Sequence, residues 1–345
     1  MNITNVTVQH VRVHKKYSLD VSPNVTLITG SNGSGKTSLI EALYIALQGT
    51  SFKGSDGDVL EREAPWYRID VHDADGTARS VKFDPSRQSG KKQFVIDGKT
   101  NYRLLEKYKY PIVLFEPDDL RLLSGSPTRR RQFIDRFISQ LDPQYATALR
   151  RYDRALRQRN SLLKQSASSE SLFAWDISLS EYGSYIIKQR DSFVRELDGR
   201  LNDVYESISH TGDKVAIKYS YGSHENIGQK LLAELHQSAE RDKLLGFTSV
   251  GPHRHDLLFE FNGSPALSVA SRGEVRSVVL ALKFLEVTII ESLTGKPPVI
   301  LLDDVFSELD KERQSYLIDL TKKNQIIITS ATNNSNLHAD YVTKL

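Results

Sequence analysis

The sequence of 345 residues contains no cysteine. Disulfide bonds and thiolate chemistry are therefore excluded, and a bound metal ion would depend on oxygen or imidazole ligands. Long hydrophobic runs are also missing. The longest apolar run, from Val278 to Ile290, is interrupted by Lys283 and Glu286, whereas a transmembrane helix needs roughly 18 apolar residues. Residues 1–20 lack the apolar core of a signal peptide. We therefore expect a cytoplasmic protein with no membrane partner.

A large excess of one charge is likewise absent, since the formal net charge is only +3. The distribution is nevertheless uneven. Between Arg121 and Gln165, eleven lysines and arginines accompany three acidic residues, so this segment carries +8 and the rest of the chain −5. A local concentration of positive charge is typical of a surface that binds a polyanion.

The two ends of the chain predict alternating strands and helices. A helical pattern at residues 38–48 follows a short apolar strand, and Asp-Gly pairs favour hairpins between the strands that come after it. After Gly246 strands and helices alternate again. The predicted strands are residues 3–13, 25–29, 68–72, 80–83, 93–96, 111–115, 257–261, 299–302 and 325–329, and the later helices are 274–293 and 311–322.

The middle of the chain has a different pattern. No proline occurs after Pro143 until beyond His210, and apolar residues recur at spacings of three and four. Arg159 interrupts the first apolar seam, and Gln189 interrupts the second. Such spacing predicts two helices packed side by side, joined by a turn at residues 166–169. The sequence thus predicts an α/β fold with a split head of mixed sheet and helices, residues 1–120 and 245–345, and an inserted helical-hairpin arm, residues 121–244.

A glycine-rich segment between a predicted strand and a predicted helix fills every specified position of the pattern G-x-x-x-x-G-K-[ST]. Its backbone amides would face a phosphate at a helix N-terminus. Lys36 would reach the β- and γ-phosphates, and Thr37 would coordinate Mg²⁺. The alternative is a turn that only caps a helix. The residues expected to bind ATP here are Gly30, Ser31, Asn32, Gly33, Ser34, Gly35, Lys36, Thr37 and Ser38.

Two acidic residues end the predicted strand 299–302. Ligands of parallel α/β sheets bind at the carboxyl ends of the strands, so Asp303 and Asp304 are expected beside the phosphate loop. Asp303 would support Mg²⁺, and Asp304 would polarise the attacking water. Solvated acids at a strand end are the simpler alternative.

Two further segments resemble parts of ABC-type ATPases, in which two subunits share each nucleotide. One is Ser307-Glu308-Leu309-Asp310, which directly follows the acidic pair. The other begins with Ser271 and Gly273 at the start of a long helix, where the resemblance implies contact with the γ-phosphate bound by a second subunit. A serine before a helix is also a common N-cap, and that reading stays open.

With these motifs, nearly the whole chain resembles the RecF family of recombinational-repair ATPases. The resemblance includes the stretches that begin at Gly49, Phe115, Gly125 and Arg159, and most distinctively Gly251-Pro252-His253-Arg254. It implies an ABC-type P-loop ATPase head, with ATP and Mg²⁺ as cofactors, that dimerises head to head on DNA. It also implies slow, DNA-stimulated hydrolysis, loading of recombinase at single-strand gaps, and RecO and RecR as partners.

Some positions depart from the family pattern. Glu274 stands where glutamine is usual and would bring an acid toward the γ-phosphate. His255 stands where an acid is usual. Arg12 matches an arginine that touches nucleotide, although its neighbours do not match. The segment 329–332 has no histidine to sense the γ-phosphate.

Arginines of the basic segment are the candidates for DNA contact. Arg150, Arg154 and Arg157 follow a spacing that displays them as one row on a helix, which would bind phosphates without reading sequence. Arginines that pair with acids of the protein itself are the alternative. The full set of candidates is Arg129, Arg130, Arg131, Arg150, Arg154 and Arg157.

Other functions fit the sequence less well. An SMC-like tether would need a far longer coiled coil, and a transport ATPase would need a membrane partner. A small-molecule P-loop kinase would have no use for Ser271, Gly273 or the basic segment. We therefore expect an ATP-driven clamp on DNA.

Overall fold

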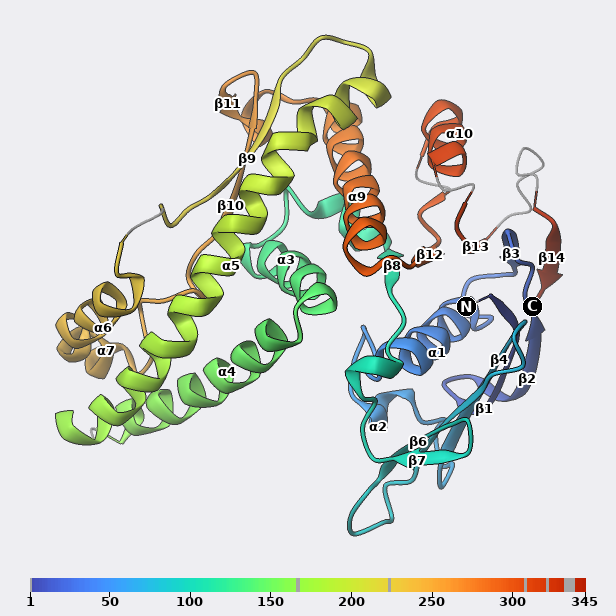
Figure 1. Ribbon diagram of the computed structural model, residues 1–345, viewed down its shortest axis with the longest axis horizontal. Coiled ribbons are helices and arrows are strands. Elements are labelled where there is room, and N and C mark those ends of the chain that lie inside the picture. The colour runs from blue at the N-terminus through green and yellow to red at the C-terminus, as the bar shows by residue number, and fades with distance from the viewer. Residues whose placement is uncertain (1, 166–167, 223–224, 307–308, 321–322, 332–338) are drawn as a thin grey trace. The chain divides into compact units, whose positions relative to one another are not determined.

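The computed structural model describes residues 2–165, 168–222, 225–306, 309–320, 323–331 and 339–345. The chain forms two compact units. Unit 1 comprises residues 1–119 and 286–345, and unit 2 comprises residues 120–285. Figure 1 labels their elements. None of the helices formed by the described residues is long and apolar enough to cross a membrane.

Unit 1 contains a five-stranded sheet in which every neighbouring pair of strands is parallel. The strand order is β14-β3-β13-β12-β8. Four of these strands are buried along their whole length, as expected for a parallel sheet covered on both faces. The strands are β3 (Val25–Thr29), β8 (Ile112–Phe115), β12 (Val299–Asp303), β13 (Ile326–Ser330) and β14 (Tyr341–Lys344).

A second sheet of unit 1 is antiparallel, with the order β2-β1-β4-β5-β6-β7. Burial alternates along β4 and β5 because only one face of this sheet packs inward. Helix α1 packs against both sheets, and residues of the two sheets and of α1 share one hydrophobic core. The strands are β1 (Ile3–Val11), β2 (His14–Asp20), β4 (Tyr67–Asp73), β5 (Ala78–Phe83), β6 (Lys92–Ile96) and β7 (Lys99–Asn101).

Among the described residues, unit 1 has fewer helices than unit 2. Those of unit 1 are α1 (Lys36–Gln48), α2 (Asp56–Val59), α10 (Lys311–Leu320) and the 3-10 turns η1 (Glu106–Tyr108) and η2 (Pro117–Arg121). Two elements are shared with unit 2: η2 crosses into it, and α9 (Arg272–Thr294) enters unit 1 at Glu286. The predicted phosphate-loop helix and the strand-helix-strand pattern at the C-terminal end are thus present.

Unit 2 is mainly helical, with a small sheet of order β11-β10-β9. Helices α4 and α5 pack along one another, which confirms the predicted hairpin, although α5 is much longer than the periodicity indicated. The elements are α3 (Pro127–Leu141), α4 (Pro143–Lys164), α5 (Ser169–Ser209), β9 (Val215–Tyr219), α6 (Ile227–Gln237), α7 (Ala239–Leu245), β10 (Leu257–Phe261), β11 (Ser264–Pro265), α8 (Ala266–Val269) and α9 (Arg272–Thr294).

The compact units and the predicted domains divide the chain at different places. The first boundary is almost the same, but the second lies within α9, between Leu285 and Glu286, and not near residue 245. The physical reason is strand pairing: β10, expected in the head, pairs along its full length with β9, so residues 257–261 belong to the sheet of unit 2. The sequence patterning does not indicate β9, α6 or α7.

Buried arginines stabilise unit 2. The Arg159 side chain is 0% exposed, and its guanidinium group donates to Asp176 at 2.6 Å, Asp242 at 2.7 Å and Thr248 at 3.0 Å. The residue that interrupts the predicted apolar seam is therefore a fully paired core cation. Arg190, also buried, joins Asp135 of α3 at 2.8 Å to the carbonyl of Pro252 at 2.7 Å.

The stretch Gly251–Arg254 packs against the same core. The Tyr152 hydroxyl donates to Nδ1 of His253 at 2.7 Å, because the other ring nitrogen faces the Thr248 carbonyl at 3.1 Å. Gly251 has φ 120, and a Cβ there would lie 2.5 Å from the Tyr152 hydroxyl. This glycine is thus required by close approach as well as by its backbone conformation. Its structural role explains why the motif needs these residue types.

Candidate functional site

The phosphate loop connects β3 to α1 in unit 1. Gly33 and Gly35 have φ 84 and φ 99, values that residues with a Cβ rarely adopt. A Cβ on Gly35 would also lie 2.3 Å from Nε2 of His14, and the same ring nitrogen is 3.0 Å from the Gly35 carbonyl oxygen. His14 therefore packs directly against the loop, and only glycine fits at position 35.

Lys36 lies at the start of α1 with its side chain 4% exposed. Its ammonium group donates to the carbonyl groups of Gly30 at 2.9 Å and Ser31 at 3.2 Å. It also lies 3.9 Å from a carboxylate oxygen of Asp304. The loop thus holds a buried cation over its own backbone, as the phosphate-loop pattern predicts.

The other end of the site is formed by the carboxyl end of β12. The Thr37 hydroxyl donates to Oδ1 of Asp303 at 2.8 Å, and the Thr329 hydroxyl donates to the same oxygen at 3.0 Å. The backbone amide of Asp304 donates to the Thr329 hydroxyl at 2.9 Å. Residues far apart in sequence therefore meet at the carboxyl edge of the parallel sheet. Thr329 was not assigned a role from the sequence, yet it orients both acids.

The donor set at Thr37 and Asp303 fits Mg²⁺. It offers a hydroxyl and a buried carboxylate, and within the described ranges no group of three or more His, Asp or Glu side chains forms an all-protein metal cage. Mg²⁺ is typically held by one or two such protein oxygens together with waters and substrate phosphates. Thr37 and Asp303 would hold the ion in this way.

Asp304 has the properties of a proton acceptor. Burial raises the pKa of its carboxyl group, the neighbouring charge of Asp303 adds to that rise, and Lys36 and Lys53 oppose it. Its backbone φ of 51 is unusual for a residue with a side chain, and such strained positions cluster at functional sites. An acid with a raised pKa beside a phosphate loop is suited to general-base chemistry.

Arg12, expected to touch nucleotide, pairs with the first helix. Its guanidinium group donates two hydrogen bonds to Glu41 at 2.8 and 2.9 Å, and its side chain is 28% exposed. Ser51, in the segment after α1, donates to the same carboxylate at 2.5 Å. No sequence pattern indicates this triad of Arg12, Glu41 and Ser51.

The segment thought to address a second subunit forms a capping box in unit 2. The Ser271 amide donates to the Glu274 carboxylate at 2.6 Å, and the Glu274 amide donates to the Ser271 hydroxyl at 3.3 Å. The N-cap reading is therefore right about local structure. Glu274 accordingly has a helix-capping contact. Ser307 and Glu308 lie outside the described residues, whereas Asp310 accepts from the Arg313 amide at 2.9 Å and caps α10.

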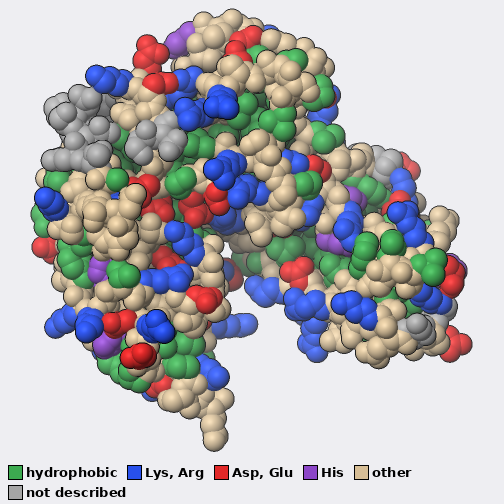
Figure 2. Space-filling model, turned by 180° about the vertical axis from the view of Figure 1, so that it is seen from behind, with side chains coloured by type: hydrophobic (Ala, Val, Ile, Leu, Met, Phe, Trp, Pro, Cys, Tyr) green, Lys and Arg blue, Asp and Glu red, His purple; other side chains and the backbone are tan. Residues whose placement is uncertain are grey.

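The candidate DNA arginines fall into two groups. Arg130 is buried, bonded to both carboxylate oxygens of Asp256 at 2.7 Å and to carbonyl groups of the chain before α3. Arg131 donates to the His255 carbonyl at 2.8 Å. By contrast the α4 arginines other than Arg159 are exposed, and Figure 2 shows Lys and Arg side chains along the edge of the helical unit. The exposed arginines are Arg150, Arg151, Arg154 and Arg157.

His255 is partly buried among aromatic side chains of unit 2, despite its unusual place in the motif. Its Nδ1 lies 2.8 Å from the Tyr219 hydroxyl, and its ring stacks on Tyr221 at 4.6 Å. Burial lowers its pKa to about 3, with the nearby Arg190 charge adding to the shift. The ring is therefore neutral at physiological pH.

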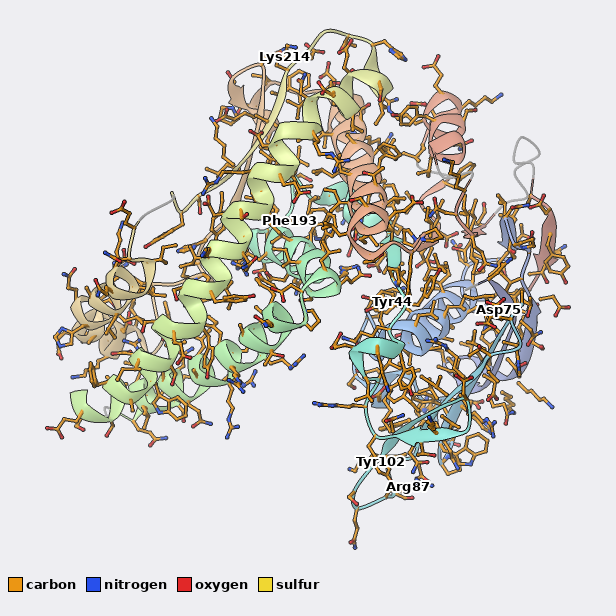
Figure 3. All side chains as sticks on the ribbon, in the orientation of Figure 1. Tyr44, Asp75, Arg87, Tyr102, Phe193 and Lys214 are labelled. Carbon is orange, nitrogen blue, oxygen red and sulfur yellow. The ribbon has the colours of Figure 1, made fainter. Side chains whose placement is uncertain are left out.

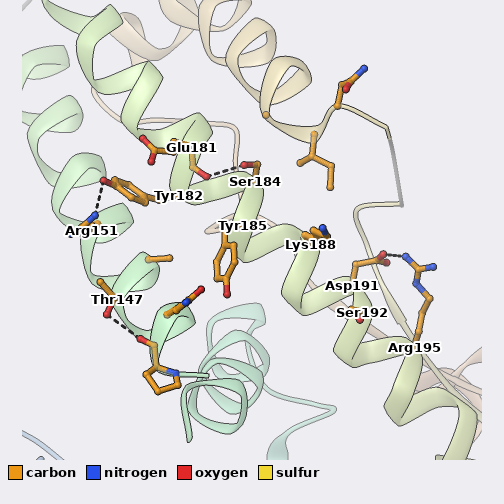
Figure 4. Close-up of a pocket in the computed structure, with 16 residues that line it drawn as sticks. Thr147, Arg151, Glu181, Tyr182, Ser184, Tyr185, Lys188, Asp191, Ser192 and Arg195 are labelled. Carbon is orange, nitrogen blue, oxygen red and sulfur yellow. Dashed lines mark hydrogen bonds and ion pairs between the residues drawn. The ribbon is translucent and has the colours of Figure 1, made fainter. Parts of the chain in front are cut away.

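A cavity of about 1130 Å³ lies between α4, α5 and the start of α6 (Figure 4). The Arg151 guanidinium donates to the Tyr182 hydroxyl at 3.2 Å, and Arg195 pairs with Asp191. Acidic and basic side chains both line the cavity, so its lining is not purely cationic.

Comparisons with known proteins identify the family of the chain. A family model described as an AAA domain matches residues 5–245. The DNA replication and repair protein RecF of Agathobacter rectalis is 33% identical over 95% of this chain and 92% of the relative.

Solved structures give the same result. The recombination mediator protein RecF-ATP in the RecFOR pathway is 31% identical, with a TM-score of 0.86 over 99% of this chain and 95% of that chain. An Smc head bound to the C-winged helix domain of ScpA is 17% identical, with a TM-score of 0.53 over 100% of this chain and 94% of that chain. That likeness shows the shared fold alone. The predicted ABC-type P-loop ATPase fold is confirmed, and the chain belongs to the RecF family.

Proposed function

We propose that this protein is an ATP-dependent DNA-binding protein of recombinational repair and replication-gap maintenance. ATP binding closes two copies head to head on DNA, and slow hydrolysis opens them. The observation that most directly supports this proposal is the hydrogen bond of 2.8 Å between Thr37 and Asp303. It joins the phosphate loop to the acidic end of β12. This arrangement is the one that phosphate-loop ATPases require.

Each residue of the site has a definite part in hydrolysis. The phosphate loop and Lys36 bind the triphosphate. Mg²⁺, held by Thr37 and Asp303, would neutralise phosphate charge. Asp304 orients the attacking water and accepts its proton, which its raised pKa favours.

Dimerisation would supply the remaining contact. Ser271 and Gly273 lie at the N-terminus of a 23-residue helix, and such a terminus favours anions. In the proposed dimer this helix faces the γ-phosphate bound by the second copy. The capping box stabilises the turn before the helix. Ser271 remains exposed to solvent.

DNA contact would involve the exposed row on α4, without base reading. Arg150, Arg154 and Arg157 lie on the solvent side of the helix and would neutralise backbone phosphates. Arg130 is omitted because its guanidinium is used within unit 2. The pathway of the similar RecF structure leads us to propose RecO- and RecR-like partners in loading recombinase at single-strand gaps.

Light scattering tests the proposal. Mass would be measured without nucleotide, with ADP, and with a slowly hydrolysed ATP analogue plus Mg²⁺, each with and without short duplex DNA. We expect a dimer only with the analogue, and DNA binding by that dimer. A monomer under every condition that still binds ATP would contradict the two-headed mechanism.

A further inference from the structure

The segment after α1 folds back toward the site. Gly49, with φ 90, ends the helix, and its carbonyl accepts a hydrogen bond of 2.9 Å from Lys92. Phe52 packs edge-on against Tyr44 of α1, with ring centroids 5.3 Å apart; Tyr44 is labelled in Figure 3. The segment is therefore anchored on both sides of Ser51.

Ser51 fixes the turn that carries the next lysine. Its hydroxyl donates to Glu41, which is 1% exposed and paired with Arg12. The same oxygen accepts from the backbone amides of Lys53 at 2.9 Å and Gly54 at 3.1 Å. The conformation at Lys53 is thus set by a buried carboxylate.

Lys53 extends from this turn to the acidic strand end. Its ammonium nitrogen lies 3.7 Å from Oδ2 of Asp303. The other oxygen of the same carboxylate accepts from Thr37 and Thr329. The two oxygens of Asp303 therefore face different groups, one toward hydroxyls and one toward a cation.

The charges explain why a lysine would stand here. The Asp303 side chain is 5% exposed, and a buried carboxylate is costly without a compensating charge. The Lys53 side chain is 40% exposed, so it loses little when it moves into water. A divalent ion at Thr37 and Asp303 would repel an ammonium group a few ångströms away.

We propose that Lys53 is a resident cation of the metal site, which neutralises Asp303 before Mg²⁺ binds and is displaced by the ion. This inference rests on the proposed function of the phosphate loop. It assigns Lys53 a positioning role: the lysine sets the Mg²⁺ concentration at which nucleotide is held tightly, and its movement couples metal binding to the segment after α1.

The test uses binding and does not depend on turnover. Fluorescence anisotropy of a slowly hydrolysed fluorescent ATP analogue would be measured at increasing free Mg²⁺ and in excess chelator. For Lys53→Met we expect the Mg²⁺ midpoint to fall about threefold to fivefold, since one partly exposed charge pair is lost. In chelator, binding of the analogue should weaken, because no cation then replaces the lysine.

Matched variants separate the possible roles. Lys91→Met, at an exposed lysine of the same unit, should leave both values unchanged, and Lys53→Arg should restore both. Ser51→Ala should shift the Mg²⁺ midpoint in the same direction as Lys53→Met but less. Circular dichroism would verify that each variant is folded.

Two outcomes would overturn the inference. An unchanged Mg²⁺ midpoint in Lys53→Met would show that the lysine does not compete with the ion. Weaker binding at every Mg²⁺ concentration would show that Lys53 contacts phosphate instead. If the wild-type protein showed no Mg²⁺-dependent binding of the analogue, the proposed function would fail together with this inference.

Discussion

Unit 1 and unit 2 both bury cations, but they use them differently. In unit 2 the guanidinium of Arg159 meets two carboxylates at 2.6 and 2.7 Å and a hydroxyl at 3.0 Å. In unit 1 the ammonium of Lys36 is bonded to two loop carbonyls, and its nearest described carboxylate oxygen is 3.9 Å away. A cation satisfied by its own chain stabilises the fold, whereas one held by weaker contacts is available to a ligand.

Replacing Arg159, the fully paired buried cation of unit 2, should have the largest effect on stability. We expect Arg159→Met to lower the free energy of unfolding by about 3–5 kcal/mol, because Asp176 and Asp242 would remain buried without their partner. Urea denaturation measures this. Arg157→Met, at an exposed position of the same helix, should change stability by less than about 0.5 kcal/mol. Equal effects of the two substitutions would mean that the two arginines do not differ as proposed.

A substitution at the phosphate-loop site should change the rate of ATP hydrolysis and leave the free energy of unfolding nearly unchanged. Asp304→Asn should reduce the rate of ATP hydrolysis by about a hundredfold or more, since it removes the proposed proton acceptor. Binding of ATP and the ATP-dependent dimer should persist. Steady-state phosphate release and light scattering check the two statements, and unchanged turnover would refute the role of Asp304.

Replacing the exposed arginines would extend the comparison to the surface. The triple change of Arg150, Arg154 and Arg157 to glutamine should weaken DNA binding about tenfold and reduce the slope of log affinity against log salt by about 2 to 3. Anisotropy with labelled duplex DNA at several salt concentrations measures both. A control triple at exposed Lys15, Lys16 and Lys99 should have a smaller effect; equal losses would argue against a specific face.

Acidification should lower the stability of unit 2 at pH values above those at which most carboxylates become protonated. Burial lowers the pKa of His253 to about 4 and that of His255 to about 3, below the ordinary value of about 6.5. The unfolded chain therefore binds more protons than the folded one in this window. Stability should fall as pH drops from about 6.5 toward 4, by up to about 1.4 kcal/mol per pH unit for each histidine.

Thermal unfolding at a series of pH values measures this slope. His255→Phe should make it shallower, whereas His72→Gln, at an exposed position on β4, should not. A flat profile for the wild-type protein would show that these histidines are not held neutral by the fold.

Short sequence patterns predicted those parts of the site whose residues are contiguous in the chain. The phosphate loop is contiguous, and an apolar strand that ends in acids indicates its own ligand edge, so Lys36, Thr37, Asp303 and Asp304 could be assigned from sequence. The alternating strands and helices of the head and the helical hairpin followed from hydrophobic periodicity, whereas the division of the head into one parallel and one antiparallel sheet did not.

Contacts over long sequence distances could not be predicted. Thr329 and Lys53 reach Asp303 from separate segments, and no spacing rule relates them. Counting charge also failed to separate Arg130 and Arg159 from the exposed arginines. For Arg159 a signal did exist, because it occupies an apolar seam position, where a charged residue must find partners within the core.

The order of the chain has a consequence for synthesis. Strands β12, β13 and β14, which complete the parallel sheet, come after residues 120–285 of unit 2. Because domains generally fold as units while the chain emerges from the ribosome, unit 2 is free to fold while the first strands of unit 1 still lack their neighbours. The pairings of β3 with β13 and of β8 with β12 close very long loops, which slows folding. We expect a nascent chain to acquire ATP binding only after β12 and β13 have emerged, so an unfinished polypeptide would be unable to engage nucleotide.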